Sequence, residues 1–357
     1  MWKNNVLITD FDYSCTDKSF EYLIWFQPSI WGIVFNELEI YIILDWRYFE
    51  KTKNIDEDRI KKILKNKDLK ITFIKSGDII ESVIKVLSKN DLKIVFEWKI
   101  AWEYIEKIEK KLNKKSEILK WWYFTENRIL KTEEEKEKIK KAIEIIDKVF
   151  LHIEELNEKW KIEWMTELEV RWIITSKIFE FWWEWESFDS IVAFWEKSAI
   201  PHCKAWNTKI WNGVLLIDMW ALYKWYCSDF TRTLWIWAEN AQYKKFKEVY
   251  DIVKNAHNNA FLNGKAWMTW KEIDFLTRNY IEKKWYWENF IHWTGHWVWL
   301  NLHEYPRIKK ESEDNIENDM IFTIEPWIYL KDNFWIRLED IVIMENWSLI
   351  KYTKSKI

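Results

Sequence analysis

The chain has 357 residues, enough for two domains and a large hydrophobic core. Its formal net charge is −3, with Lys and Glu interspersed, so no basic stripe indicates a nucleic-acid partner. The N-terminus lacks a signal-peptide pattern, no apolar run reaches about 18 residues, and the three cysteines are scattered. Composition therefore predicts a cytoplasmic protein with no membrane span and no disulfide framework.

The chain contains 31 tryptophans and only 5 glycines, whereas glycine normally makes up about 7% of residues. Many tryptophans stand where turns are expected, as in LDWRY (44–48), NTKIWNG (207–213) and MENWSL (344–349). Such turns often need positive φ, which suits glycine and not a residue with a Cβ. We therefore predict that most of these tryptophans are glycines, encoded by UGA codons that the organism reads as glycine. The alternative is a chain that is truly rich in tryptophan.

Residues 1–122 are predicted to form a small α/β domain. Short β-rich runs such as WGIVF (31–35) and IYIILD (40–45) alternate there with Lys/Glu-rich amphipathic segments. Thr132 and Glu135 then have the spacing of a capping box, which begins a long helix. The six apolar residues of its predicted buried face recur at helical spacing, namely Ile139, Ala142, Ile143, Ile146, Phe150 and Ile153. From about residue 185 strands and helices mix, which predicts an α+β domain.

The segment LLIDMWALYKWYCSDFTRT (215–233) is predicted to be a β-hairpin that carries two aspartates. If Tyr223 and Lys224 form its turn, Asp218 and Asp229 face each other across the ladder, where like charges repel. Both aspartates have apolar neighbours, so a divalent cation would neutralise them economically. Taken alone, the pair fits two ordinary strand-end aspartates equally well.

A second predicted hairpin, residues 321–344, places Glu325 and Glu339 symmetrically about Asp332. Four inward carboxylates and a histidine on a third strand match a hard, oxygen-rich site for two metals. Four of the six histidines fall in SAIPHCK (198–204) and FIHWTGHWVWLNLHEYP (290–306), namely His202, His292, His296 and His303. This clustering favours a functional site over buried structural histidines.

With tryptophan read as glycine, three segments become HGTGHGVGLNLHEYP, LLIDMGALYKGYCSDFTRT and FTIEPGIYL. In this form the chain resembles the pita-bread metallopeptidases, specifically the aminopeptidase P and prolidase branch. The similarity extends to residues 182–202, and to YLIGFQPS (22–29) and LDGRYFE (44–50) near the N-terminus. It implies an α+β fold in which a creatinase/prolidase-type domain, residues 1–122, precedes a pita-bread catalytic domain, residues 123–357.

The resemblance implies that two divalent metal ions are bound, most simply Mn²⁺, with Co²⁺ or Zn²⁺ as alternatives. Asp218 would chelate one metal, and His296 and Glu325 would hold the other. Asp229 and Glu339 would bridge the two. The ions would lower the pKa of a bridging water that attacks the scissile carbonyl, and Glu325 would accept a proton.

The resemblance also implies roles for residues around the metals. His202, His292 and His303 would position the substrate and stabilise the tetrahedral intermediate. Arg337 would orient the nearby carboxylate of Glu339 or meet a substrate carboxylate.

Arg307 stands where some prolidases carry an arginine for the carboxylate of a dipeptide, and such a pair favours a dipeptidase over an aminopeptidase. A solvent-exposed arginine is the alternative. The expected protein is an Xaa-Pro metallo-exopeptidase and a homodimer, which acts on short proline-containing peptides without a nucleic-acid or membrane partner. One alternative is a methionine-aminopeptidase-like enzyme, which shares the five ligands. The other is a metal-free pita-bread protein that binds partners, in which ligand positions should be lost.

Overall fold

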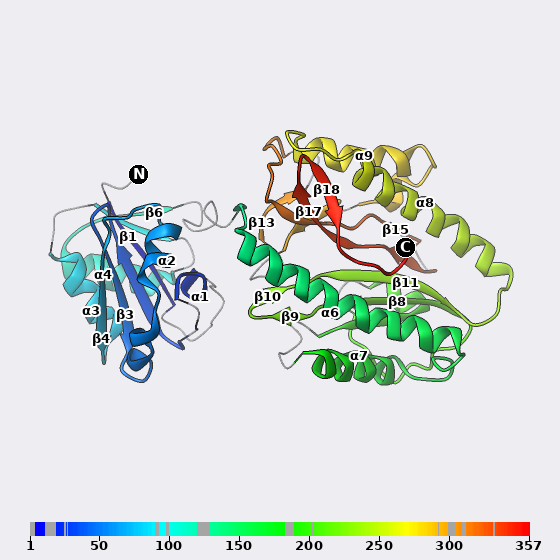
Figure 1. The fold of residues 1–357 in the computed structure, drawn as a ribbon, viewed down its shortest axis with the longest axis horizontal. Coiled ribbons are helices and arrows are strands. Elements are labelled where there is room, and N and C mark those ends of the chain that lie inside the picture. Colours follow the sequence, from blue (N-terminus) through cyan, green and yellow to red (C-terminus); the bar gives the residue numbers. More distant parts are fainter. Residues whose placement is uncertain are drawn as a thin grey trace. The chain divides into compact units, whose positions relative to one another are not determined.

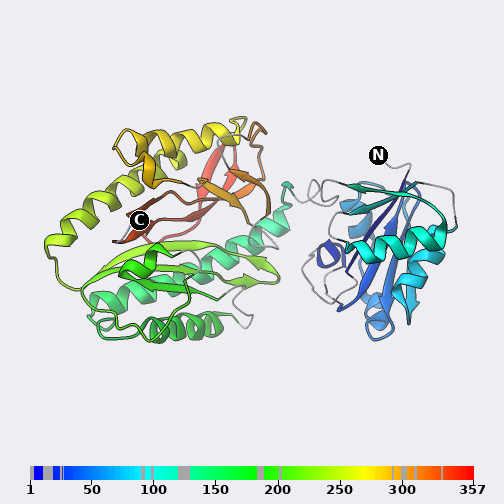
Figure 2. The ribbon, with the colours of Figure 1, turned by 180° about the vertical axis from the view of Figure 1, so that it is seen from behind.

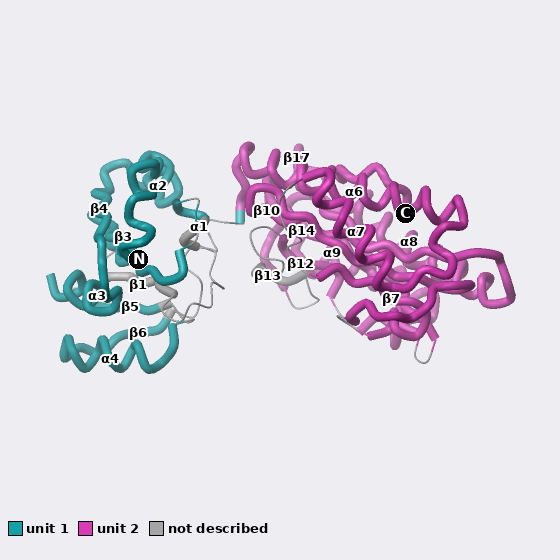
Figure 3. Tube along the Cα trace, turned by 90° about the horizontal axis from the view of Figure 1, so that it is seen from below, with its two compact units in different colours: residues 1–129 teal, residues 130–357 magenta. Residues whose placement is uncertain are grey.

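The computed structural model describes residues 4–10, 19–24, 26, 28–89, 93–97, 100–119, 129–182, 189–200, 203–291, 293–298, 304–308, 312–330 and 333–357 (Figure 1). The chain divides into two compact units, residues 1–129 and 130–357 (Figure 3). The predicted boundary at residue 122 falls outside the described residues, so the domain limits stay a prediction. Within the described ranges, no helix is long and apolar enough to cross a bilayer.

The N-terminal unit is built on a six-stranded sheet with the order β4-β3-β2-β1-β5-β6. Its strands are β1 (Asn4–Asp10), β2 (Trp31–Phe35), β3 (Glu39–Asp45), β4 (Lys70–Ser76), β5 (Lys93–Glu97) and β6 (Ser116–Leu119). Its helices are α1 (Ser19–Ile24), η1 (Phe49–Asn54), α2 (Glu57–Ile63), α3 (Ile79–Leu87) and α4 (Trp102–Leu112). Strand β4 pairs in parallel with β3, and β5 pairs in parallel with both β1 and β6. Parallel neighbours need a crossover connection, which is usually a helix. Val34 and Ile43 of the sheet share one apolar cluster with Val83 of α3 and Ile105 of α4.

The helices of the second unit are α6 (Glu133–Glu158), α7 (Glu167–Phe181), α8 (Ala241–Asn263) and α9 (Trp270–Glu282), with the short turns η2 (Trp195–Ala199) and η3 (Trp287–Asn289). The predicted capping box of α6 is confirmed, because Thr132 and Glu135 exchange side-chain and backbone hydrogen bonds. All six residues of the predicted apolar face are buried. The same box begins α7 and α9, so three long helices have sharply defined starts.

The strands of this unit form two main sheets. The first has the order β11-β8-β7, with β7 (Ile191–Phe194), β8 (Gly213–Met219) and β11 (Phe230–Ile236), and its hairpin tip is β9 (Leu222–Tyr223) with β10 (Tyr226–Cys227). The second has the order β13-β12-β14-β17-β18, with β12 (Gly295–Trp297), β13 (Glu304–Ile308), β14 (Ile321–Ile324), β17 (Asp340–Glu345) and β18 (Ser348–Lys351). A separate pair joins β15 (Trp327–Tyr329) to β16 (Trp335–Arg337). The strands lie between the α6–α7 pair and the α8–α9 pair (Figure 1; Figure 2).

Strand β8 shows how the layers direct side chains. Leu215 and Ile217 belong to the apolar cluster that contains α6 and α7. Val214 and Leu216 belong to the other cluster, which contains α8 and β16. Side chains alternate between the faces of a strand, so Asp218 lies on the same face as Val214 and Leu216. The aspartate therefore faces the interior between the layers.

The aspartate hairpin has a different register from the predicted one. Its turn is Lys224–Trp225, and Asp218 pairs with Thr231 and not with Asp229. Both turn residues have positive φ, 47° and 73°, as the favoured two-residue hairpin turn requires. The predicted turn was one residue too early, so the predicted cross-strand partner of Asp218 was wrong by two residues. Because side chains alternate with a period of two, this shift leaves Asp218 and Asp229 on one face, as diagonal neighbours.

The second hairpin has the predicted register. Ile324 pairs with Asp340, and Trp327 pairs with Arg337, so both ladders are symmetric about position 332. The two glutamates at 325 and 339 lie between these ladders.

Candidate metal centre

Five predicted ligands from five separate places in the chain come together in the second unit. Asp218 lies in β8, Asp229 lies just before β11, and His296 lies in β12. Glu325 follows β14, and Glu339 precedes β17. Four of the five residues are buried, and the side chain of Glu325 is 14% exposed. Strand ends from both sheets thus supply the cluster.

The distances within the cluster are those of a compact ligand set. One side-chain atom each of Asp229, His296 and Glu339 lies within 4.8 Å of the other two. Nε2 of His296 is 3.3 Å from Oδ2 of Asp229 and 3.5 Å from Oε1 of Glu325. Nδ1 of His296 is 3.1 Å from the carbonyl oxygen of Trp297, so the tautomer protonated at Nδ1 donates there. Nε2 is then left with its lone pair directed at the carboxylates.

Thr231 joins the two sheets beside this cluster. The backbone N–H of Glu339 donates to the carbonyl oxygen of Thr231 over 3.0 Å. The Thr231 hydroxyl donates to Oε2 of Glu339 over 2.6 Å. It also accepts from Nε of Arg337 over 3.1 Å. Arg337 was predicted to orient Glu339, and the structure connects the two through Thr231. Arg337 also contacts Asp218 directly, because its Nη2 donates to Oδ2 of that residue.

The electrostatics of the cluster indicate that cations belong there. Burial, and then the charge of Glu339, raise the pKa of Asp229 well above its usual value. The same two causes raise the pKa of Glu325. Burial and the repulsion of Asp218 raise the pKa of Glu339 to about 7, against the opposing charge of Arg337. Four carboxylates at this depth cannot all be ionised together without added positive charge.

The hydrogen bonding leads to the same conclusion. Both carboxylate oxygens of Asp229 and Oε1 of Glu339 are buried, and no described residue outside the cluster donates a hydrogen bond to them. Buried carboxylate oxygens normally have such donors or bind a metal. Hard oxygen ligands with one imidazole suit a first-row divalent ion. The residues present therefore fit divalent cations.

Four predicted residues lie wholly or partly outside the description. His202, His292 and His303 fall outside the described residues. Arg307 lies in β13, where its backbone pairs with that of His296, but its side chain is not described. The predicted roles of these four residues remain predictions.

A buried ion pair behind the cluster was not predicted. Nη2 of Arg232 donates to Oδ1 of Asp340 over 2.7 Å, and Nη1 donates to the carbonyl oxygen of Glu339 over 2.6 Å. The Thr353 hydroxyl donates to the same Asp340 oxygen over 2.7 Å. His257 lies 3.4 Å from Asp340, and burial lowers its pKa to about 4, so it is neutral at pH 7. The available sequence signal was a single arginine in the apolar strand FTRTLWI.

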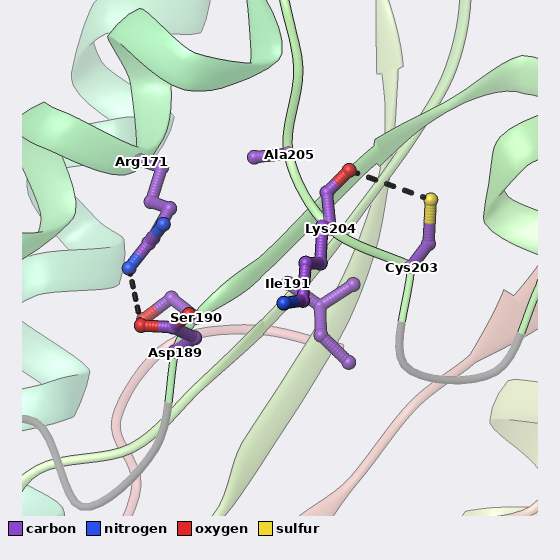
Figure 4. A pocket seen from close by; sticks show the side chains of 7 residues that line it. All are labelled: Arg171, Asp189, Ser190, Ile191, Cys203, Lys204 and Ala205. Carbon is purple, nitrogen blue, oxygen red and sulfur yellow. Dashed lines mark hydrogen bonds and ion pairs between the residues drawn. The ribbon is translucent and has the colours of Figure 1, made fainter.

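A cavity of about 360 Å³ lies at the start of β7 (Figure 4). It is lined by Arg171, Asp189, Ser190, Ile191, Cys203, Lys204 and Ala205. Ile191 of this lining pairs with Asp218 in the β7–β8 ladder. Nη2 of Arg171 is 2.5 Å from Oδ1 of Asp189, a contact marked by a dashed line in Figure 4. Burial raises the pKa of Cys203, which keeps its thiol protonated. This volume is in the usual range of small-molecule sites, about 300–1,000 Å³.

Comparison with known proteins adds independent support. Residues 137–346 match metallopeptidase family M24. The Xaa-Pro dipeptidase of Pyrococcus furiosus is 33% identical over 323 residues, which cover 88% of this chain and 87% of that protein. The solved prolidase structure from Pyrococcus furiosus has a TM-score of 0.85 at 29% identity and covers 99% of this chain and 97% of that chain. The solved X-Pro aminopeptidase from Thermotoga maritima has a TM-score of 0.82 at 29% identity, with coverages of 99% and 96%.

These similarities confirm the predicted α+β fold with a pita-bread catalytic unit, since they span nearly the whole chain. A metallopeptidase family implies divalent metal ions, which agrees with the chemistry of the cluster. The family matches more than half of the chain, and a relative that is 33% identical covers most of it. The chain therefore belongs to metallopeptidase family M24.

Proposed function

We propose that this protein is a metal-dependent exopeptidase that hydrolyses the Xaa-Pro bond of short peptides. The observation that carries the proposal is the buried cluster of Asp218, Asp229, His296, Glu325 and Glu339, whose close-set carboxylates fit bound cations. Its setting is a chain similar along most of its length to an Xaa-Pro dipeptidase. Bound divalent ions supply Lewis-acid chemistry, because they lower the pKa of water and polarise a carbonyl group.

The protein's own residues have distinct tasks in this reaction. Glu325 is the proton acceptor, since its side chain is the most exposed of the five and can reach a water molecule. Thr231 and Arg337 hold Glu339 and Asp218 in place by the contacts described above. His202, His292 and His303 position the substrate. The cavity at the start of β7 offers room for a small side chain of the substrate.

The protein would bind two Mn²⁺ ions through the five ligands, in the pattern that the family resemblance implies. Oxygen-rich sites with a single imidazole suit Mn²⁺, and Co²⁺ or Zn²⁺ are the alternatives. The active form is a homodimer, the commonest symmetric assembly. Metal analysis after dialysis against each ion, together with the mass of the purified protein in solution, tests both assignments.

A peptide panel tests the function directly. Ala-Pro, Ala-Pro-Ala and Met-Ala-Ser are each incubated with the Mn²⁺-loaded protein and with the chelated protein. Metal-dependent cleavage of the two proline peptides is expected, with Met-Ala-Ser left intact. Cleavage of Met-Ala-Ser alone would favour a methionine-aminopeptidase-like enzyme. A protein that binds no metal and cleaves nothing would be a partner-binding member of the fold.

Arg307→Ala should weaken the hydrolysis of Ala-Pro far more than that of Ala-Pro-Ala. The reason is a charge-assisted pair with the carboxylate of the dipeptide, which contributes about 1.5–3 kcal/mol, or roughly ten- to a hundredfold in kcat/KM. The pairing of the Arg307 backbone with that of the proposed ligand His296 supports this role. The measurement compares kcat/KM on both peptides, with Arg307→Lys as a variant that keeps the charge. Equal losses on the two peptides would contradict the preference for dipeptides.

We also propose that most tryptophans of this chain are recoded glycines. Thirteen of the described non-glycine residues have positive φ, and eight of them are tryptophans. The eight are Trp160, Trp164, Trp195, Trp225, Trp237, Trp267, Trp285 and Trp347. Tryptophan makes up only 31 of 357 residues, so this share is far above a random one. Positive φ is disfavoured for residues with a Cβ and readily adopted by glycine.

The side chains support the same proposal. Four buried indole nitrogens lack a hydrogen-bond partner among the described residues, those of Trp182, Trp270, Trp297 and Trp335. A buried indole N–H normally has an acceptor. Other indoles project into solvent, and Trp285 is 85% exposed. Sites shaped for glycine explain both the buried indoles without a partner and the indoles that project into solvent.

A further inference from the structure

We propose that Thr294, held by helix α9, is a positioning residue that sets the geometry of His296 and Glu325. This inference rests on the proposed function, because it concerns the metal subsite formed by these two ligands. No role for Thr294 follows from the five-ligand set. Its hydroxyl group lies in a hydrogen-bond network that runs from α9 to the metal cluster.

The network begins with three fully buried side chains. The Thr294 hydroxyl donates to Oδ1 of Asp274 over 2.8 Å. The hydroxyl oxygens of Thr277 and Thr294 are 2.5 Å apart. The Thr277 hydroxyl also donates to the backbone carbonyl oxygen of Asp274 over 2.9 Å, so its single proton is shared between that carbonyl and the Thr294 hydroxyl. Thr277 and Thr294 are 0% exposed and Asp274 is 1% exposed, so none of the three can exchange its partner for water.

Arg278 fixes the acceptor at the centre of this network. Its Nε donates to Oδ2 of Asp274 over 2.6 Å, and its Nη2 donates to Oδ1 over 3.0 Å. This two-pronged contact holds the carboxylate in one orientation. Nη1 of Arg278 donates to the carbonyl oxygen of Phe290 over 3.0 Å. One helix therefore fixes the ligand segment both at Phe290 and at Thr294.

Thr294 passes this restraint to two ligands. Its carbonyl oxygen accepts from the backbone N–H of Glu325 over 2.8 Å. His296 follows two residues later in the chain, and its own N–H donates to the Thr323 hydroxyl over 3.0 Å. Nε2 of His296 and Oε1 of Glu325 then lie 3.5 Å apart. The two ligands assigned to one metal are thus fixed relative to each other through a single residue.

Two substitutions separate the hydroxyl group from the rest of the side chain. Thr294→Val keeps the shape and removes the donor, which leaves Asp274 without one of its partners. Thr294→Ser keeps the donor and removes only a methyl group. Loss of a residue that orients a metal ligand typically lowers metal affinity about 10- to 100-fold. We therefore expect Thr294→Val to weaken one of the two Mn²⁺ equivalents by this factor and Thr294→Ser to leave both close to the parent.

The measurement is a calorimetric Mn²⁺ titration of the metal-stripped protein, with no substrate present. The glycine-containing form is used for the parent and for every variant. Thr269→Ala is the matched control, since it removes the hydroxyl that caps α9 but touches neither Thr294 nor Asp274. Thr277→Val is a milder second variant that removes only the outer hydroxyl group, and we expect a smaller loss at the same equivalent.

The outcomes are distinct. Selective weakening of one equivalent in Thr294→Val, with Thr294→Ser and Thr269→Ala close to the parent, supports the proposal. Unchanged Mn²⁺ binding in both Thr294→Val and Thr277→Val overturns it, and so does an equal loss in Thr294→Ser. If the parent binds Mn²⁺ but cleaves no Xaa-Pro peptide, the proposed function fails while the titration still decides the role of Thr294.

Discussion

Asp229→Asn is expected to abolish peptidase turnover and to reduce the bound metal below two equivalents. Both carboxylate oxygens of Asp229 are buried, and none of the described residues outside the cluster donates a hydrogen bond to them. An amide keeps the volume but removes the negative charge that would bridge two dications. Steady-state kinetics on Ala-Pro and metal analysis of the purified variant measure the two losses.

The same substitution should stabilise the metal-free protein. Burial and Glu339 hold the pKa of Asp229 above its usual value, so the folded state binds a proton more tightly than the unfolded state does. That difference lowers the stability of the metal-free parent as pH rises from about 4 towards the raised pKa. Asp229→Asn cannot titrate and should lose less stability over that range. Thermal unfolding in chelator at pH 5 and pH 8 tests this sign.

A matched control is Asp251→Asn on α8, where the aspartate is half exposed and pairs with Lys247. Such surface pairs contribute little, so activity, metal content and stability should all stay close to the parent. Near-normal turnover of Asp229→Asn with two metals bound would show that the ligand assignment is wrong. A metal-free Asp229→Asn protein that is less stable than the parent at pH 8 would contradict the repulsion described for the cluster.

The two hairpins show what could be predicted from the sequence. The register around position 332 is as predicted, because a polar turn between two apolar strands has one natural centre. The aspartate hairpin was predicted two residues out of register, since its turn at Lys224–Trp225 requires positive φ at both positions. A glycine at 225 is a known signal for that turn, and a printed tryptophan hides it.

The residues that hold the ligands in place could not be predicted from the sequence, for another reason. Thr294 and Asp274 are 20 residues apart, and Arg232 and Asp340 are 108 apart. Such contacts depend on how a helix packs against a sheet, and no local spacing encodes them. The four carboxylates could be noticed because they stand out in apolar hairpins, whereas the choice of His296 among four clustered histidines came from the family resemblance. The threonines that orient them look like ordinary strand and helix residues.

A gene that encodes glycine at 220, 225, 293, 297, 299, 327 and the other turn and motif positions should give a folded, metal-dependent peptidase. The chain as printed should be insoluble or inactive. Each tryptophan at positive φ costs about 1–2 kcal/mol, so the eight described positions cost about 8–16 kcal/mol together. A typical domain has a stability of only about 5–15 kcal/mol. The strain alone is therefore as large as the whole free energy of unfolding.

Partial replacement tests the physical reason for this effect. One gene carries glycine only at the eight positive-φ positions, and a second carries it at Trp102 and Trp172 within helices α4 and α7. The first set should raise solubility and melting temperature strongly, because it relieves backbone strain. The second should change them little, because glycine within a helix costs about 0.5–1 kcal/mol relative to alanine. A larger gain from the second set would contradict the strain argument.

Mass spectrometry of the native protein decides the recoding itself. A peptide that covers residues 290–306 contains three of the printed tryptophans, Trp293, Trp297 and Trp299. We expect this peptide to be lighter by three tryptophan-to-glycine differences. Trp297 is 1% exposed and its ring lies 5.6 Å from that of Trp270, so an indole there fills buried space beside α9. Three intact tryptophans in that peptide would overturn the recoding and leave the eight strained positions as a property of the native chain.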